Sequence, residues 1–385
     1  MYLMDIPFPD SYEASRARFI QDFERLRSKW TDSRVESYPL KIDPALSIDY
    51  AWAVPRKKEH LVILTTGLHG IEGYVGSVML KIFMDEFAPR LNAENTGLLL
   101  VHAINPWGMK NRRRYNENNV DLNRNFLWDE IFDPKINPDY EPLTSLLNPT
   151  RPIKNLFASD VAFIFRLIGC LLRLGIPRIR VGMLSGQYRH PRGVQFGGQS
   201  TQESAQLMQC LFQQALDEYE QVIHLDMHTG YGLRYQMCIV NSTREQASNP
   251  ELMRRFNYPL IVSANPTQFY TVTGDITENF YQLRDGKFQS KKLYSTCFEF
   301  GTFGYTLPAQ IRSMRATILE NRLFQYGAKS DALRNAIKRE YQELFFPAEK
   351  KWREEAMADF RQAMQGILRA YQLTGNSEGM TWQRR

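Results

Sequence analysis

Residues 60–73 read HLVILTTGLHGIEG and decide the fold. The run LVILTT, apolar and rich in β-branched residues, is typical of a buried strand, and the glycine after it permits a sharp turn. Residues 72–87 (EGYVGSVMLKIFMDEF) carry apolar positions at helical spacing, and residues 97–105 (GLLLVHAIN) form a second apolar run. A strand, a helix and a strand in this order predict an open α/β sheet.

Other segments extend this pattern in both directions along the chain. We expect a leading helix over 11–30, further strands over 46–54, 221–228 and 294–301, and a helical tail from residue 328. No internal repeat and no Gly/Ser-rich linker divides the chain. We therefore predict a catalytic domain over 1–325, with an insertion at about 129–198, and a helical extension over 326–385 packed on it.

The composition fits a folded protein and argues against a nucleic-acid partner. The 385 residues are 43% hydrophobic and 23% charged, which is close to average globular usage. Lys and Arg exceed Asp and Glu by 48 − 42 = 6. This modest excess forms no basic stripe with interleaved aromatic residues, so a nucleic-acid binding function is disfavoured.

The cysteines and the N-terminus predict a cytoplasmic protein. The four cysteines lie far apart without a CxxC pair, which argues against a disulfide framework and favours a reducing compartment. The first residues mix acidic residues and prolines and lack the basic head and apolar run of a signal peptide. The longest apolar stretch, 161–174, is too short to span a membrane and carries Arg166. We interpret it as a buried or substrate-facing helix, with contact to a membrane surface as the lesser alternative.

Two strand ends carry residues that suit a metal ion. His69 and Glu72 stand three apart on the turn after the first strand, and His228 ends the strand predicted over 221–228. An HxxE pair alone also fits an exposed helix start. Together with His228 it makes a His2Glu set with a fourth position free for water, as in catalytic zinc sites. His224 lies four residues earlier on the same strand face and is the rival third ligand.

A polar segment at 105–126 lies between these ligand segments. It has few apolar positions and fits a solvated loop, but it also contains Arg114, Asn116, Asp121, Asn123 and Arg124. An aspartate can accept a hydrogen bond from a metal-bound imidazole and fix its tautomer. Arginines suit an oxyanion or a carboxylate, because the guanidinium offers a bidentate fork.

The strand predicted over 294–301 carries Glu299 between two phenylalanines. Burying an unpaired carboxylate costs free energy, so a glutamate at this buried position requires a compensating partner or a function. A place beside a zinc-bound water supplies one, because the carboxylate can then act as the general acid/base of metal-dependent hydrolysis.

Four motifs in order, HGIEG, RRYNENNVDLNRNF, LDMHTGYG and FEFGTFG, resemble those of the zinc carboxypeptidases, in particular the bacterial carboxypeptidase-like branch of unknown function. The resemblance covers about residues 50–305 and implies a mixed open sheet flanked by helices, of the phosphorylase/hydrolase-like type. It implies one zinc ion per chain, held by His69, Glu72 and His228.

The resemblance also implies roles for the polar segment and for Glu299. Arg114 corresponds to the arginine that polarises the scissile carbonyl, and Asn123 and Arg124 to the pair that holds the terminal carboxylate of the substrate. Asp121 looks like the partner of the first zinc histidine, and Glu299 like the general base.

Three features depart from the family pattern. Ile71 stands where digestive members have an arginine, which weakens the extended peptide subsites. Tyr270 is a candidate for the phenolic residue of the mobile loop, although a core or surface tyrosine fits equally well. The insertion at 129–198 is absent from the compact pattern. It either covers the site with Tyr188, Arg189, His190 and Arg192 or forms a solvated loop.

The leading hypothesis is a zinc hydrolase that cleaves an amide bond next to a free carboxylate, in a small peptide or an N-acyl amino acid. The alternative is a deacylase similar to aspartoacylase and succinylglutamate desuccinylase, and a catalytically silent zinc-binding protein is a third possibility. No GxxxxGK[ST] loop occurs, which disfavours an ATP-dependent enzyme.

Overall fold

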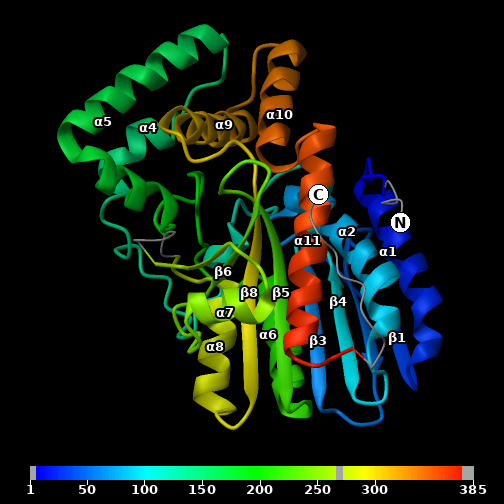
Figure 1. The fold of residues 1–385 in the computed structure, drawn as a ribbon. Helices are drawn as coiled ribbons and strands as arrows, with labels where there is room; N and C mark the ends of the chain where they lie inside the picture. The colour runs from blue at the N-terminus through cyan, green and yellow to red at the C-terminus, as the bar shows by residue number, and fades with distance from the viewer. Residues whose placement is uncertain (1–5, 266–271, 375–385) are drawn as a thin grey trace.

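A computed structural model describes residues 6–265 and 272–374 (Figure 1). Its strands form one sheet in the order β1-β2-β4-β3-β5-β8-β6-β7. The strands are β1 (Asp32–Pro39), β2 (Ser47–Val54), β3 (His60–Thr66), β4 (Thr96–His102), β5 (Gln221–Gly230), β6 (Met237–Asn241), β7 (Ile261–Ser263) and β8 (Lys292–Gly301). The central strands β4, β3, β5 and β8 are parallel, whereas β1 pairs with β2, β2 with β4, and β6 with β8 in antiparallel fashion. The expected mixed α/β sheet is confirmed.

Helices cover both faces of this sheet. In Figure 1, α1 (Tyr12–Leu26), α2 (Gly73–Ile82) and α11 (Lys350–Ala370) lie in front of it. Along β5, Met227 faces α2, whereas His224 contacts aromatic rings from α6 (Glu203–Glu218) and α8 (Ile276–Lys287). Because successive strand residues point to opposite faces, these two helical layers lie on opposite sides of the sheet.

The parallel strands bring their carboxyl ends to one edge. The register of β5 and β8 places His228 directly beside Glu299, and Thr66 at the end of β3 pairs with Met227. Side chains that follow β3, β5 and β8 therefore meet at this edge, where open α/β sheets bind ligands.

The insertion at 129–198 contains α4 (Thr144–Leu147) and α5 (Leu156–Leu184). Its apolar residues, among them Leu143, Phe163 and Leu167, form a separate core with Met314 and Ile318 of α9 (Leu307–Tyr326). The backbone of α5 is interrupted at Gly175, which has a φ of +74°, and Pro177 begins its second segment. No helix in the described parts of the chain is long and apolar enough to cross a membrane.

The predicted C-terminal extension has two packing environments. Trp352, Phe360 and Ile367 of α11 are buried in the main core beside the sheet. The preceding α10 (Asp331–Phe345) packs against α9, and its last residues reach the carboxyl edge of the sheet. The remaining short helices are α3 (Pro106–Lys110) and α7 (Asn249–Phe256). A domain division at residue 326 stays a prediction.

Candidate functional site

The turn after β3 brings His69 and Glu72 together. Residues Gly70–Glu72 form one 3₁₀ turn whose backbone N–H groups at Gly70 and Ile71 donate to the carbonyls of Arg114 and Arg113. A Cβ atom at Gly70 would lie 2.2 Å from the backbone of Gly108, so only glycine allows this approach. The turn places His69 Nδ1 2.9 Å from Glu72 Oε1.

The end of β5 adds His228 to this pair. Its Nδ1 lies 3.1 Å from His69 Nδ1 and 3.2 Å from Glu72 Oε2. All three side chains are buried, and their potential ligand atoms lie within 4.8 Å of one another. The Thr229 N–H donates to Glu72 Oε2 at 2.8 Å and fixes the carboxylate.

The outer nitrogens of both imidazoles meet carboxylates. His69 Nε2 lies 3.1 Å from Asp121 Oδ1, and His228 Nε2 lies 2.6 Å from Asp226 Oδ2. A carboxylate accepts hydrogen bonds, so each Nε2 carries a proton, and each Nδ1 faces the other ring and Glu72. This donor set suits Zn²⁺, which binds imidazole nitrogen and carboxylate oxygen with an open fourth position.

Sequence reasoning missed Asp226. The signal was present, because Asp226 stands two residues before His228 and so faces the same side of β5. Thr65 Oγ1 donates to the second oxygen of Asp226 at 2.6 Å. His224, the rival ligand, lies 2.9 Å from this same hydroxyl and 2.8 Å from Ser295 Oγ, and does not reach the cluster. Burial lowers the pKa of His224 to about 4.

Glu72 and Glu299 have opposite pKa shifts. Burial would raise the pKa of Glu72, but the two imidazoles lower it to about 2. Burial and repulsion from Glu72 raise the pKa of Glu299 to about 8. Glu299 accepts a hydrogen bond from the Tyr231 N–H at 2.9 Å and is 6% exposed. A carboxyl group of this pKa can exchange a proton with water near neutral pH.

Arg114 connects the cluster to α10. Its Nε donates to Asp121 Oδ2 at 2.9 Å, and its Nη1 lies 3.4 Å from Glu72 Oε1. The Tyr341 hydroxyl accepts from the Arg114 backbone N–H at 3.3 Å, and the Phe345 ring lies 5.9 Å from the guanidinium carbon. The C-terminal extension thus forms one wall of the site.

Arg124 is buried, and one of its N–H donors has no hydrogen-bond partner among the described residues. Its Nη1 and Nη2 donate to the carbonyls of Asn123 at 2.9 Å and Leu184 at 2.6 Å. Its Nε is buried and has no hydrogen-bond partner among the described residues. Gly186 makes room for the side chain, because a Cβ atom there would lie 2.5 Å from Arg124 Cδ. Asn123 binds the start of α8, donating to Asp275 Oδ2 and accepting from the Ile276 N–H, each at 3.0 Å.

A cavity of about 120 Å³ brings most of the predicted site residues together. Glu72 and Asp121 lie behind its wall and are fully buried. The predicted residues that line the cavity are His69, Arg114, Asn123, Arg124, His228 and Glu299. Tyr270 lies outside the described residues.

The insertion residues that line the cavity are not those named from the sequence. Met183 and Leu184 at the end of α5, with Gln195, line the cavity. Tyr188 is buried beside it and donates to the Arg124 carbonyl at 2.7 Å. Arg189 and His190 instead pair with Glu141 at the surface, and the Arg192 carbonyl accepts from Asn321.

An apolar cavity of about 170 Å³ adjoins this one between α5 and α9. The two cavities share Met183, Leu184, Gly230, Tyr231 and Ser313. An apolar group could therefore extend from the candidate site into this second space.

We expect His228→Ala to abolish stoichiometric zinc binding and His224→Ala to retain it, because only His228 directs a nitrogen at His69 and Glu72. Elemental analysis of the purified variants measures this. Full zinc in the His228 variant together with loss in the His224 variant would show that the ligand assignment is wrong.

In metal-free protein, Glu299→Gln should become progressively more stable than the wild type as pH rises. The folded-state pKa of Glu299, about 8, exceeds the unfolded value of about 4.3. The stability that protonated Glu299 gives the wild type is therefore fully present below about pH 4 and is lost as pH rises through about 8. Urea denaturation at about pH 5 and about pH 9 should show the difference in unfolding free energy growing by a few kcal/mol, on the order set by linkage. The surface variant Glu354→Gln is the control, and a difference independent of pH would contradict the assignment.

Comparisons with known proteins give distant structural likenesses. Carboxypeptidase A from Helicoverpa armigera is 13% identical over 90% of this chain and 73% of its own, with a TM-score of 0.43. Bovine thrombin-activatable fibrinolysis inhibitor is 14% identical over 87% of this chain and 97% of its own, with a TM-score of 0.45. Succinylglutamate desuccinylase from Chromobacterium violaceum is 13% identical over 79% and 73%, with a TM-score of 0.35.

No match to the chain is found among curated proteins. A family model does match, over residues 8–359, which include every candidate ligand and site residue named above. The chain belongs to the family described as Protein of unknown function (DUF2817).

Proposed function

We propose that this protein is a zinc-dependent hydrolase that cleaves an amide bond next to a free carboxylate, in a small peptide or an N-acyl amino acid. One observation carries the proposal: Glu299, Arg114 and Arg124 line the same cavity as the two histidines of the His69, Glu72 and His228 cluster. A base, an oxyanion partner and a carboxylate anchor beside a candidate metal site are the groups that amide hydrolysis requires.

The three cluster residues would hold one zinc ion per chain. When bound, zinc supplies a Lewis acid that polarises a carbonyl and makes water acidic near neutral pH. Asp121 and Asp226 keep both imidazoles in the tautomer that offers Nδ1, so the protein itself fixes which atoms serve as ligands.

Glu299 would move the protons of the reaction. Its carboxylate takes a proton from the attacking water and returns it to the leaving nitrogen as the C–N bond breaks. The Tyr231 N–H binds one carboxylate oxygen and leaves the other for this transfer. The positive charge of a metal ion would lower the pKa of Glu299 from about 8 and keep the base ionised at neutral pH.

The two arginines would bind opposite sides of the cleaved bond. Arg114 faces the cavity beside Glu72 and would stabilise the negative charge that develops on the carbonyl oxygen. Among the described residues the buried Nε of Arg124 has no hydrogen-bond partner, and an anionic ligand is the simplest way to compensate a buried guanidinium. A carboxylate bound there would position the amide bond against the metal cluster.

The deacylase alternative uses the same groups on a different substrate. The adjoining apolar cavity, lined by residues such as Leu167, Leu171 and Ile311, fits an apolar acyl chain as well as an apolar side chain. A hydrolysis screen on peptides and N-acyl amino acids, with metal content measured on the same sample, distinguishes the two reactions.

Glu299→Gln should retain zinc and lose turnover by at least about a hundredfold, the usual contribution of a positioned acid/base group. Glutamine keeps the acceptor for the Tyr231 N–H but cannot take a proton. Steady-state kinetics beside the control Glu354→Gln measures the effect. Turnover equal to that of the wild type would remove Glu299 from the mechanism.

Amidating the substrate carboxylate should abolish efficient cleavage, because Arg124 would lose its anionic partner. Arg124→Ala should raise KM and lower kcat/KM, since the anchor also positions the scissile carbonyl. Arg124→Lys should rescue only in part, because an ammonium lacks the planar fork.

The exposed Arg189→Ala serves as the matched control for these kinetics. Cleavage of amidated substrates as fast as of free acids would make Arg124 structural. The enzyme would then be an endopeptidase or a neutral amidase.

A further inference from the structure

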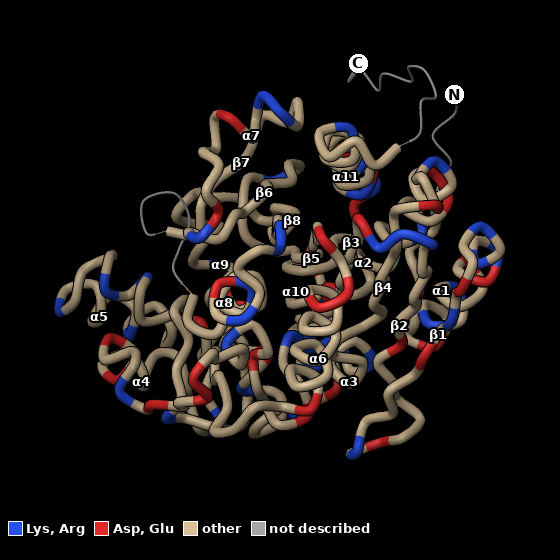
Figure 2. Tube along the Cα trace, turned by 90° about the horizontal axis from the view of Figure 1, so that it is seen from below, with Lys and Arg blue, Asp and Glu red and all other residues tan. Residues whose placement is uncertain are grey.

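The helix α5 exposes a row of large apolar side chains. It lies at the edge of the molecule, away from the sheet (Figures 1 and 2). Its inner face, with Phe163, Leu167 and Cys170, is buried in the core of the insertion. A second apolar stripe points outward at helical spacing. Its residues and exposed fractions are Phe157 77%, Val161 38%, Ile164 43%, Phe165 72%, Ile168 48% and Leu172 84%.

This stripe is unusual for the surface of a folded protein. Contiguous exposed apolar residues mark interaction surfaces, whereas single ones need no explanation. The stripe covers more than three helical turns and contributes nothing to the candidate active site. It therefore fits a role in binding a partner.

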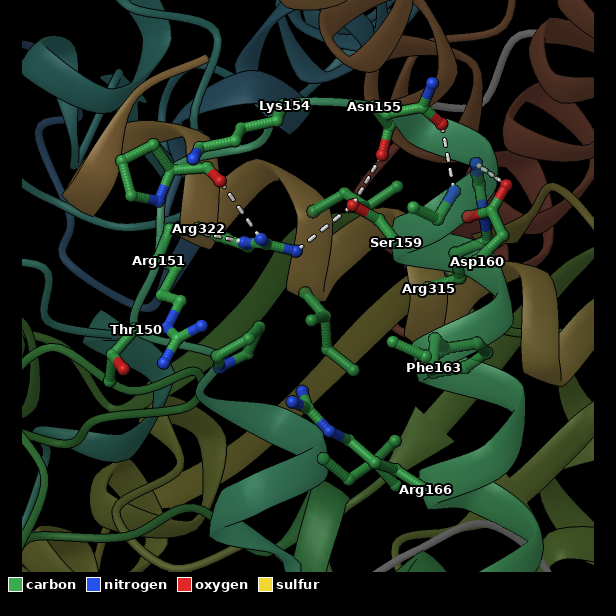
Figure 3. Close-up of a pocket in the computed structure, with 17 residues that line it drawn as sticks. Thr150, Arg151, Lys154, Asn155, Ser159, Asp160, Phe163, Arg166, Arg315 and Arg322 are labelled. Atoms are coloured by element: carbon green, nitrogen blue, oxygen red, sulfur yellow. Dashed lines mark hydrogen bonds and ion pairs between the residues drawn. The ribbon is translucent and has the colours of Figure 1, made fainter. Parts of the chain in front are cut away.

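A basic cavity lies along the same helix. It has a volume of about 520 Å³, and Figure 3 shows the residues that line it. Five of them are cationic and one is a carboxylate: Arg151, Lys154, Arg166, Arg315, Arg322 and Asp160.

The single carboxylate, Asp160, already forms an ion pair within the cavity. Asp160 pairs with Arg315 at 2.7 Å, and Arg322 donates to the carbonyls of Arg151 and Pro152 and to Ser159 Oγ. For Arg151, Lys154 and Arg166 the described part of the chain offers no ion pair. These three cations remain available to an anionic partner.

The charges argue against a second copy of this chain as the partner. In a two-fold dimer the same patch meets itself, so the cations beside α5 would face cations. The only acidic residue within α5 is Asp160, which cannot compensate them. An apolar stripe flanked by Arg and Lys is instead typical of helices that lie in the headgroup region of a membrane.

We propose that α5 and the basic cavity beside it dock the protein on an anionic phospholipid bilayer. The stripe enters the boundary between headgroups and acyl chains, and Arg151, Lys154 and Arg166 bind lipid phosphates. The binding is peripheral. Leu167 and Leu171 of the same helix line the apolar cavity next to the candidate site, so docking places that cavity close to the bilayer.

Vesicle flotation of the full chain tests the proposal without measuring hydrolysis. We expect binding to vesicles of phosphatidylcholine mixed with phosphatidylglycerol, little binding to phosphatidylcholine alone, and weaker binding at high salt. The triple variant Phe157→Ser, Phe165→Ser, Leu172→Ser should lower the partition coefficient at least about tenfold, because it removes the most exposed apolar area. Ile42→Ser, exposed on another surface, is the matched control.

A second triple variant tests the cations. Arg151→Ala, Lys154→Ala, Arg166→Ala should lower the partition coefficient about a hundredfold, since each cation at an anionic surface contributes roughly fivefold. Lys57→Ala, exposed at the far end of the sheet, should bind as the wild type does. Circular dichroism establishes that the variants fold, and the single variant Leu172→Ser replaces the apolar triple if that protein does not.

Three outcomes would overturn the proposal. The first is equal binding of the wild type to both kinds of vesicle, or to neither. The second is wild-type affinity of both triple variants. The third is a lipid-free dimer, detected by sedimentation equilibrium, that the apolar triple variant dissociates, because a second copy would then cover the stripe.

Discussion

The structure of the site depends on compensating buried carboxylates. Four carboxyl groups, Glu72, Asp121, Asp226 and Glu299, surround two imidazoles, and the Arg114 guanidinium contacts Glu72 and Asp121. Burying this much negative charge is costly unless cations or hydrogen bonds balance it. Without a metal ion, protons supply the balance. Burial opposes protonation of His228, but Asp226 and Glu72 raise its pKa well above the usual value, and the pKa of Glu299 rises to about 8. In the proposed enzyme, the charge of a bound zinc ion would supply this balance instead.

The same constraint explains why the site residues come from so many elements. Two of the carboxylates accept backbone N–H groups from the end of β5: Glu72 from Thr229, and Glu299 from Tyr231 just after it. These contacts exist only because β3, β5 and β8 are parallel neighbours in fixed register. The strand order and register therefore determine which side chains meet at the candidate site, and a change of register would separate them.

The sequence predicted the parts of the fold with strong local patterns. The buried strands β2, β3, β4, β5 and β8 are apolar runs, and each ends near its predicted boundary. β1 was missed because it is an edge strand of mixed, half-exposed residues (DSRVESYP), and β7 because it has three residues. β6 (MCIVN) was also missed, although all five of its residues are buried. Apart from Asp226, sequence motifs identified the site residues on strand ends and in the polar segment. The roles of Tyr341 and Phe345 were not, because an α10 helix packed on Arg114 has no signature in its own sequence.

The insertion shows how one added segment can serve two surfaces at once. The end of α5 contributes Leu184 to the candidate site, where its carbonyl accepts a hydrogen bond from Arg124, and Gly186 makes room for the Arg124 side chain. The first part of the same helix carries the outward apolar stripe, and the interruption at Gly175 separates the two segments. One inserted helix thus supplies an exposed apolar surface with its first segment and part of the cavity wall with its second.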